Sequence, residues 1–366
     1  MNDGVKLGVL GGGQLARMLL QAGSSMNLDL FFMDKDSSCS VSNLTKNLKI
    51  GDSTNYHDVL SFGKNLNILT IETTNVNIEA LKFLEKIGVK VYPQPSIIEI
   101  IQDKGLQKMF FNKLQIPTAL FEFIYTAEDI ENNQSPQSFV LKSRKHIFDN
   151  TGSVLVNDKS TIKTIQHPMI AEQVIAIDKK ISIIGARNAN GEVAFFDPVE
   201  MVFNLQLNML DYLVCPANLK LEQINFLKDT IKLILENLDY IGVLAVEFFL
   251  TKEGKLLINE ISPKPHNSGH HTIEGSYTSQ FEQTLRAVLN YPLGPTNTIA
   301  DTITINLIGG SNPDKFFMTL ALKGVYLHLY NKKPLLDNKI GHITIINPNR
   351  KRLFENAQKV KDILNT

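Results

Sequence analysis

The chain has 366 residues, enough for two or three compact units with hydrophobic cores of their own. Its 37 Lys and Arg residues balance 37 Asp and Glu residues, so no overall field favours nucleic acid or an anionic membrane. The two cysteines, Cys39 and Cys215, lie far apart, which argues against a disulfide framework or a zinc site. No signal peptide and no apolar run of about 18 residues is present, so we expect a cytoplasmic protein acting on small molecules, with no nucleic-acid or membrane partner.

The amino-terminal part alternates strands with helices, which is typical of a parallel, doubly wound sheet. The predicted elements are a strand at Lys6–Leu10, a helix at Gln14–Ala22, and strands at Leu28–Met33 and Leu66–Ile71. Such sheets bind ligands beyond the carboxyl ends of their strands. There we expect Gly11–Gln14, Asp34 and Glu72, in a unit that ends near Tyr92–Pro95.

The loop GGGQLA at 11–16 follows the first strand and satisfies Gly-x-Gly-x-x-Ala. With Asp34 at the end of the next strand, this is a passable but weak dinucleotide fingerprint. The same turn suits any phosphate at a helix amino terminus. A phosphorylated ligand is the more economical interpretation, because a nicotinamide cofactor would leave the second half of the chain unexplained.

The next segment combines cations with probable strands. A helix is expected at 96–114, interrupted at Gly105, with strands at 139–144 and 168–175. Lys104, at a helix end, and Lys142, on a strand beside the charged loop 141–153, could contact a phosphate. The alternatives are a helix-dipole interaction for Lys104 and a solvated loop for Lys142. The segment AEQVI at 171–175 could offer main-chain groups to a purine or form an edge strand.

The carboxy-terminal half contains clear helix and strand signals. We expect a hairpin of 181–186 with 193–196 around Asn190-Gly191, a helix at 221–238, a capping box at Ser279–Glu282 that opens a helix, strands at 302–308 and 325–330, and a terminal helix at 351–364 with Leu353, Ala357, Val360 and Leu364 buried.

Two carboxylates are predicted to face each other in the segment VLAVEFFLTKEGKLLINEI. If Glu253-Gly254 form a two-residue turn, Glu247 lies opposite Glu260, with Cβ atoms roughly 5 Å apart. Two ionised acids among apolar neighbours need compensation, and Mg²⁺ with its oxygen ligands meets that need. A shared proton, or another loop length that turns Glu247 to water, stays possible.

The loop NEISPKPHNSGHH at 259–271 follows the second of these strands. Asn259 adds an oxygen ligand or phosphate contact beside Glu260. Lys264, His266 and Asn267 lie on a segment braced by two prolines and would face whatever the metal carries. Each histidine alone is more often structural, but the cluster indicates a site for an anion or substrate.

Three segments together resemble the 5-(carboxyamino)imidazole ribonucleotide synthases, ATP-grasp enzymes of purine biosynthesis: GVLGGGQLARML, NEISPKPHNSGHHTIEGSYTSQFEQTLRAVL and KIGHITIIN. The resemblance covers nearly the whole chain, and the HNSGH…TIE…SQFEQ run is its most specific part. It implies an α/β protein, α+β overall, with the ATP-grasp fold. The implied units are a Rossmann-like substrate-binding domain (1–95), a lid subdomain with its leading helix (96–175), a catalytic subdomain (176–295) and a small carboxy-terminal domain (296–366).

The resemblance also implies an activity and a set of site residues. ATP and bicarbonate would form carboxyphosphate, which carboxylates the amine of aminoimidazole ribonucleotide and releases ADP and phosphate; a homodimer is the family's expectation. The implied ATP site is Lys104, Lys142, Asp149, Gly152, Glu172, Gln173, Val174, Ile175, Asn259 and Glu260, with Mg²⁺ on Glu247 and Glu260. The implied substrate contacts are Gly13, Gln14, Leu15, Glu72 and Lys339, and the implied catalytic residues are Lys264, His266 and Asn267.

Several positions depart from the family pattern. The lid, usually close to GYDGxG, reads Ile147-Phe-Asp-Asn-Thr-Gly152, which restricts how closely its backbone approaches phosphates. The other departures are Lys180 for a ribose-binding glutamate, Asn204 for histidine, Thr74 for glutamate, and Lys264 and Asn338 for arginine. Besides an active synthase, the alternatives are therefore a nucleotide-binding protein that turns over poorly and an ATP-grasp ligase for a related phosphorylated amine. A nicotinamide dehydrogenase ranks last.

Overall fold

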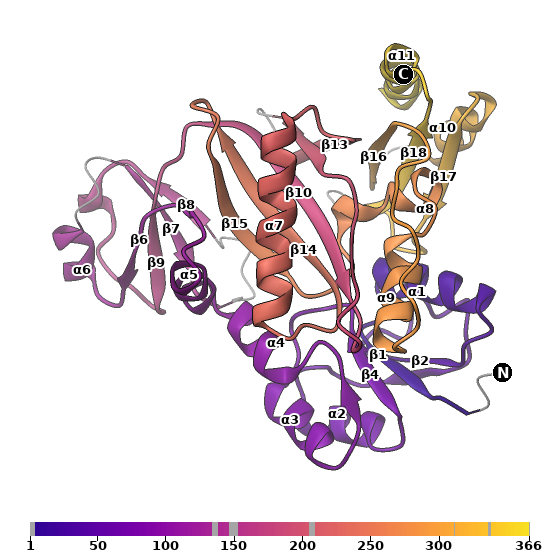
Figure 1. The fold of residues 1–366 in the computed structure, drawn as a ribbon, viewed down its shortest axis with the longest axis horizontal. Coiled ribbons are helices and arrows are strands. Elements are labelled where there is room, and N and C mark those ends of the chain that lie inside the picture. The colour runs from indigo at the N-terminus through magenta and orange to yellow at the C-terminus, as the bar shows by residue number, and fades with distance from the viewer. Residues whose placement is uncertain are drawn as a thin grey trace.

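Three β-sheets organise the chain in a computed structural model, which describes residues 4–133, 138–145, 153–204, 209–310, 312–335 and 338–365. Figure 1 shows them as three lobes: an amino-terminal unit at the bottom, a small sheet on the left, and a long central sheet that continues to the upper right. None of the helices in the described ranges has the length and apolar character that crossing a bilayer requires.

The amino-terminal sheet is parallel, with strand order β3-β2-β1-β4-β5, as the alternation of strands and helices predicts. Its strands are β1 (Leu7–Leu10), β2 (Leu30–Asp34), β3 (Leu48–Ile50), β4 (Ile68–Ile71) and β5 (Lys90–Val91). Its helices are α1 (Gln14–Ser25), α2 (Tyr56–Gly63) and α3 (Ile78–Lys86). Strands β1 and β4 are buried along their whole length, because helices cover both faces of a parallel sheet.

The helix predicted at 96–114 is two helices, α4 (Pro95–Gln102) and α5 (Lys104–Lys113). The interruption lies at Asp103 and not at Gly105, which corrects the prediction. The Asp103 side chain accepts hydrogen bonds from the amides of Gly105 and Leu106 and so caps α5. Asp103 therefore lies at the end of α4 and caps the start of α5, and Gly105 is not the cause of the interruption.

The second sheet is antiparallel, with order β6-β9-β7-β8, and we call it the lid sheet. Its strands are β6 (Phe121–Ile124), β7 (Phe139–Ser143), β8 (Ser153–Val156) and β9 (Met169–Gln173), accompanied by α6 (Ala127–Asn132) and the short helix η1 (Lys159–Thr161). Strand β9 pairs with both β6 and β7, so the alternative that 171–175 forms an edge strand is wrong.

The third sheet has nine strands, with order β15-β14-β10-β12-β13-β16-β18-β17 and β11 beside β10. The strands are β10 (Ile177–Arg187), β11 (Val193–Phe195), β12 (Val199–Asn204), β13 (Met209–Cys215), β14 (Gly242–Thr251), β15 (Leu256–Ser262), β16 (Thr302–Ile308), β17 (Val325–Leu329) and β18 (Lys339–Ile346). Strand β13 pairs with β16, so the sheet runs without a break from the predicted catalytic subdomain into the predicted carboxy-terminal domain.

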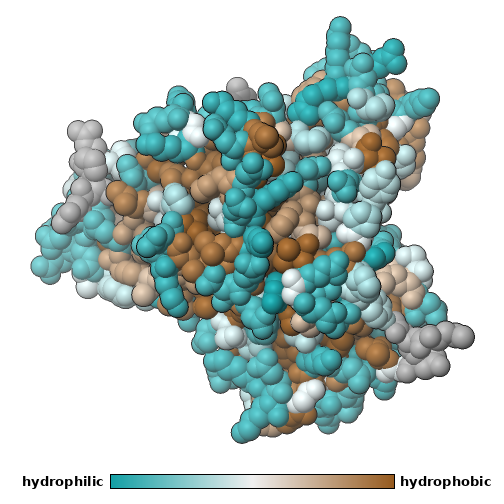
Figure 2. All heavy atoms as spheres, in the orientation of Figure 1, coloured by the Kyte–Doolittle hydropathy of each residue, from teal (hydrophilic) through white to brown (hydrophobic). Residues whose placement is uncertain are grey.

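Helices cover this long sheet and join it to the amino-terminal unit. They are α7 (Leu221–Asn237), α8 (Thr272–Gly275), α9 (Gln280–Val288), α10 (Pro313–Met318) and α11 (Arg350–Asn365), with the short helices η2 (Asn267–Gly269) and η3 (Thr319–Ala321). Helix α7 lies across β10 and β14, and α9 packs against α1 (Figure 1). Leu353, Ala357 and Val360 of α11 are buried and Leu364 is partly buried, as predicted. Figure 2 shows hydrophobic side chains in the middle of this face and hydrophilic ones along its outer rims.

The capping box predicted at Ser279 is half confirmed. The Ser279 hydroxyl accepts a hydrogen bond from the Glu282 amide and caps α9. The Glu282 carboxylate, however, binds Arg286 one turn later at 2.7 Å instead of returning to the cap. A half-buried acid with an arginine at i+4 can form an ion pair that competes with the reciprocal cap bond.

Candidate active site

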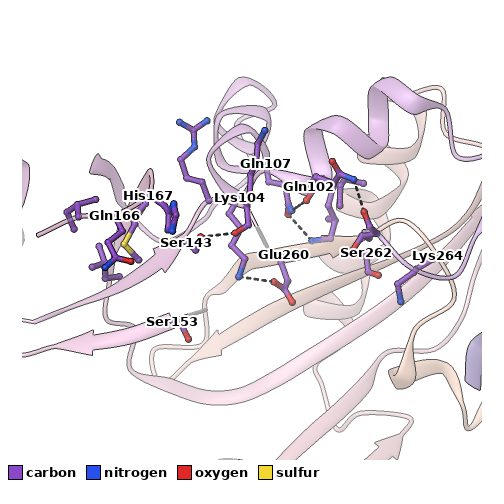
Figure 3. Close-up of a pocket in the computed structure, with 18 of the residues that line it drawn as sticks. Gln102, Lys104, Gln107, Ser143, Ser153, Gln166, His167, Glu260, Ser262 and Lys264 are labelled. Atoms are coloured by element: carbon purple, nitrogen blue, oxygen red, sulfur yellow. Dashed lines mark hydrogen bonds and ion pairs between the residues drawn. The ribbon is translucent and has the colours of Figure 1, made fainter. Parts of the chain in front are cut away.

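A cavity of about 780 Å³ lies between the lid sheet, the start of α5 and the end of β15 (Figure 3). Among its lining residues are five that the sequence predicts for the site: Lys104, Glu260, Lys264, His266 and Asn267. In Figure 3 the Lys104 and Glu260 side chains reach toward each other across the cavity, and their Nζ and Oε2 atoms lie 3.9 Å apart. Segments separated by more than 150 residues therefore meet around one space.

Glu247 and Glu260 are directly paired across β14 and β15, as predicted. The route to that pairing differs from the prediction, because Phe248 pairs with Ile258 and the extra residue Asn259 forms a β-bulge. The Thr251 amide donates to the Lys255 carbonyl, so the turn between the strands has three residues rather than two. The longer turn shifts the register by one residue, and the bulge shifts it back before Glu260.

The paired carboxylates place two acidic side chains side by side at the end of the cavity. Burial, together with the neighbouring Glu260 carboxylate, raises the pKa of Glu247 to about 7. The Asn259 side chain lies 3.5 Å from Glu247 Oε2 and adds a further polar group. Within the described ranges, no group of three or more His, Cys, Asp or Glu residues is arranged to hold a metal ion. The oxygen pair fits Mg²⁺ only if other oxygens, such as those of a nucleotide, complete its shell.

The loop after β15 is held in place by Gln280 of α9. The Gln280 side chain accepts from the His266 amide at 2.9 Å and donates to the His266 carbonyl at 2.7 Å. His266 Nδ1 lies 2.8 Å from the Ser268 hydroxyl, while Nε2 lies 3.6 Å from Glu247 Oε1. Burial, reinforced by the charge of Lys264, lowers the pKa of His266 to about 3, so its imidazole is neutral near pH 7.

The glycine loop before α1 binds carboxylates of its own chain. The Gly12 amide donates to Asp34 Oδ2 at 2.7 Å, and the Gly13 amide donates to Glu72 Oε1 at 2.8 Å. A Cβ at Gly11, where φ is +103°, or at Gly13 would meet the Glu72 side chain at 2.6 Å. These two amides therefore already have acceptors within the chain, and a phosphate at this loop, which stays a prediction, would have to use the loop's other groups.

Cations gather beside this loop instead. Lys332 donates to Gln14, whose amide group in turn lies 3.5 Å from Asn267 Oδ1. Burial lowers the pKa of Lys264 and of Lys339, and the charge of Lys332 adds to the effect on Lys339. Burial also raises the pKa of Glu72, an effect that the Lys264 charge opposes. The sequence does not point to Lys332, because the segment YNKK at 330–333 is typical of an ordinary exposed turn.

The remaining predicted substrate contact, Leu15, is buried in the hydrophobic core at 4% exposure, so its side chain is not available to a substrate. On the lid sheet, Lys142 Nζ lies 2.8 Å from Glu172 Oε2 and 3.5 Å from Asn259 Oδ1. Gln173 and Val174 are exposed and Ile175 is half-buried, at the exit of β9. Lys108, which no sequence motif indicates, has its Nζ 3.4 Å from Glu172 Oε1.

The positions that depart from the family pattern are distributed unevenly. Asp149, Gly152, Ile147 and Asn150 lie outside the described residues, as does the side chain of Asn204. Lys180 Nζ lies 3.8 Å from the centre of the Phe203 ring, and burial lowers its pKa. Thr74 lines the cavity, and its carbonyl accepts from Gln102; Asn338 is exposed at the start of β18.

Comparison with known proteins gives the family. Family models match residues 4–102 (Ribonucleotide synthetase preATP-grasp domain), 109–281 (ATP-grasp domain) and 302–356 (Phosphoribosylaminoimidazole carboxylase C-terminal domain). The chain is 31% identical to an N5-carboxyaminoimidazole ribonucleotide synthase of Brucella melitensis, over 95% of this chain and 98% of that protein. The chain belongs to the N5-carboxyaminoimidazole ribonucleotide synthase family of ATP-grasp enzymes. That membership confirms the predicted fold and resemblance and excludes a nicotinamide dehydrogenase.

Two further relatives are similar to the chain over most or all of its length. It is 32% identical to the chloroplastic phosphoribosylaminoimidazole carboxylase of Vigna aconitifolia over 93% of its length, but spans only 64% of that larger protein. The N5-carboxyaminoimidazole synthase of Aspergillus clavatus, solved with ADP and 5-aminoimidazole ribonucleotide, shares 28% identity and a TM-score of 0.90 over the full length of both chains. The three matched family domains parallel the units expected from sequence, whose own boundaries stay a prediction.

Proposed function

We propose that this chain catalyses the ATP- and bicarbonate-dependent carboxylation of 5-aminoimidazole ribonucleotide, giving N5-carboxyaminoimidazole ribonucleotide, ADP and phosphate. The observation that supports this most is the single cavity that joins the predicted phosphate residues, Lys104 and Glu260, to the predicted substrate loop, Lys264 to Asn267. In a family member related over nearly the whole chain, one space of about 780 Å³ is large enough to bring nucleotide and acceptor together.

For the nucleotide, we assign Lys104, Lys142 and Asn259 to the phosphates and the main chain from Gln173 to Ile175 to adenine. Asp149 and Gly152 would complete the lid over the phosphates. Glu247 and Glu260 would hold Mg²⁺, and the bound ion would supply charge neutralisation for the transferred phosphoryl group. Oxygen ligands on two facing strands fit that role, because the pair is costly without a cation.

For the acceptor, the phosphate would bind between Lys332, which donates to Gln14, and Lys339, which is near enough to feel the charge of Lys332. In the described part of the chain, no carboxylate forms an ion pair with Lys339. Glu72, Gly13 and the Leu15 main chain form the adjoining wall. Bicarbonate oxygen would attack the γ-phosphate of ATP, and the amine nitrogen would then attack the carboxyl carbon as phosphate leaves. The amine loses a proton in this step, which the departing phosphate would accept, while His266, whose pKa is lowered to about 3, would act as a neutral hydrogen-bonding group and not as the base.

The decisive experiment measures release of ADP and phosphate from Mg-ATP with and without 5-aminoimidazole ribonucleotide and bicarbonate. We expect release that requires both, and loss of at least about a hundredfold in rate in Glu260→Gln without loss of fold. Release independent of the ribonucleotide would support a changed acceptor, and ADP binding without turnover would support a silent nucleotide-binding protein. Wild-type-like turnover in Glu260→Gln would remove the metal assignment. The homodimer and the cytoplasmic location stay predictions, and light scattering would check the first.

A further inference from the structure

Lys108 lies at the junction between the lid sheet and the long central sheet. It projects from α5 and is 2% exposed. Its Nζ donates to Thr118 Oγ1 at 2.6 Å and lies 3.4 Å from Glu172 Oε1. A lysine is rarely buried to this degree without partners, because its charge loses hydration. Burial lowers the pKa of Lys108, and the charge of Lys142 acts in the same direction.

Glu172 divides its carboxylate between two lysines. One oxygen faces Lys108, and the other accepts from Lys142 at 2.8 Å. All three side chains are buried or nearly so, at 3%, 4% and 15% exposure for Lys108, Glu172 and Lys142. Two cations share the Glu172 carboxylate, and Glu260 also acts on Lys108, so Glu172 alone neutralises Lys142 only in part. Lys142, the more exposed cation, is the member that can meet an added anion.

Thr118 links the same group to the strand that carries the paired carboxylate. Its hydroxyl accepts from Lys108 and donates to the Ile258 carbonyl at 2.8 Å, and the Ile258 amide donates to Pro117. Ile258 directly precedes Asn259 and Glu260. Lys108 therefore touches, through one ammonium group, the lid strand β9 and the anchor of β15.

We infer that Lys108 is a positioning residue for the nucleotide site: with Glu172 it holds Lys142 toward the phosphates and fixes the lid sheet against β15. The inference rests on the proposed role of Lys142 as a phosphate contact. Without Lys108, Glu172 keeps Lys142 as its one ion-pair partner among the described residues. The remaining one-to-one pair is tighter, so the Lys142 ammonium is drawn toward Glu172 and offers less to a phosphate.

The test compares Lys108→Met with Lys113→Met, a matched control on the same helix with an exposed side chain. Calorimetry with Mg-ADP should show affinity about tenfold weaker in Lys108→Met, equal to about 1.4 kcal/mol, and unchanged in the control. In turnover, the KM for ATP should rise by about the same factor while kcat changes less than about threefold and the KM for 5-aminoimidazole ribonucleotide is unchanged. Equal ADP affinity in folded Lys108→Met and wild type would overturn the inference.

Two more variants separate positioning from mere stability. Because Lys108 acts through Glu172, the effects of Lys108→Met and Glu172→Gln on ADP affinity should be non-additive in the double variant, whereas full additivity would contradict the inference. If Lys108→Met does not fold, Thr118→Val removes the linking hydroxyl at nearly constant volume and should weaken ADP binding about two- to fivefold, and no weakening would overturn it. ADP binding needs no turnover, so these outcomes stand apart from failure of the proposed reaction.

Discussion

The Glu247 side chain titrates close to neutral pH, so the proposed cation would compete with a proton for this carboxylate. Its pKa is raised by burial to about 7, against about 4.3 for an unfolded-state glutamate. Between those values the native chain binds more protons than the unfolded chain, so stability falls as pH rises through about 4.3 to 7.

Glu247→Gln removes this dependence. Without nucleotide or metal, the free energy of unfolding of the wild type relative to the variant should fall by about 1 to 3 kcal/mol between pH 4.5 and pH 8. Urea unfolding of both proteins across that range measures the difference and cancels the titration of other groups. Parallel curves for the two proteins would contradict the raised pKa. Mg²⁺ with ATP should reverse the loss in the wild type alone.

Lys332 and Lys333 are neighbours in sequence with different surroundings. Lys332 contacts Gln14 of the amino-terminal unit, whereas Lys333 has only a distant interaction with Asp36. We expect Lys332→Met to raise the KM for 5-aminoimidazole ribonucleotide about tenfold or more and to leave the KM for ATP unchanged, since a charged contact to the substrate phosphate is lost. Lys333→Met is the matched control in the same initial-rate assay. Equal effects of both changes would point to overall charge instead of a phosphate contact.

At the scale of the element, Ser279 caps the start of α9, the helix that holds the proposed catalytic loop through Gln280. The Ser279 hydroxyl caps α9, and the next residue, Gln280, holds the main chain of His266 from both sides. Ser279→Ala should lower the free energy of unfolding, measured by urea unfolding, by about 1 kcal/mol. The reason is that the Glu282 amide in the first turn of α9 loses its hydrogen-bond acceptor. Ser24→Ala, at an exposed position of α1, should change it by less than about 0.5 kcal/mol, and Ser279→Asp should recover most of the loss.

Helices and strands were more predictable from the sequence than the bulges, turns and caps that connect them. The parallel unit, the two lid strands predicted at 139–144 and 168–175, and the Glu247–Glu260 pairing follow from periodicity and spacing. The bulge at Asn259 does not, because counting residues from a turn assumes an even register. The prediction assumes a two-residue turn and no bulge, and it still finds the correct pair. It does so because the real turn is one residue longer and the bulge at Asn259 shifts the register back by one residue. The same limit applies to Asp103, where a side-chain cap ends a helix that composition alone would continue.

Site residues were predictable where a motif carries them and not where only three-dimensional contact does. Glu260, Lys264, His266 and Asn267 sit in one continuous motif and meet at one cavity. Lys108 and Lys332 belong to no such run, and their roles depend on partners 64 and 318 residues away, Glu172 and Gln14. A single sequence contains no signal for such pairs, because hydrophobic patterning fixes which face is buried but not which charges meet there.

At the scale of the whole molecule, one hydrophobic cluster holds the amino-terminal unit to the rest. It contains Leu15 and Leu19 of α1, Leu285 of α9, and Tyr330 beyond β17. Leu285→Ala should therefore cost about 2 to 5 kcal/mol and loosen the amino-terminal unit from α9, which urea unfolding followed by circular dichroism would detect. Leu221→Ala, at 73% exposure, is the control and should change stability by less than about 0.5 kcal/mol. Similar values for both changes would argue that the units are held together elsewhere.

The continuous ladder from β13 to β16 has a consequence for cutting the protein into pieces. Because β13 pairs with β16 along Tyr212 to Cys215, a chain ending before residue 296 would leave one side of β13 with unsatisfied amides and carbonyls. Such an open strand edge recruits the same edge of another copy, so that fragment is expected to form aggregates rather than a smaller enzyme. Among the described residues, the lid sheet shares no ladder with the other two sheets, and an isolated bridge joins Thr118, which precedes β6, to Ile258 of β15. The lid sheet is the part that could be exchanged between relatives without exposing an edge of the central sheet.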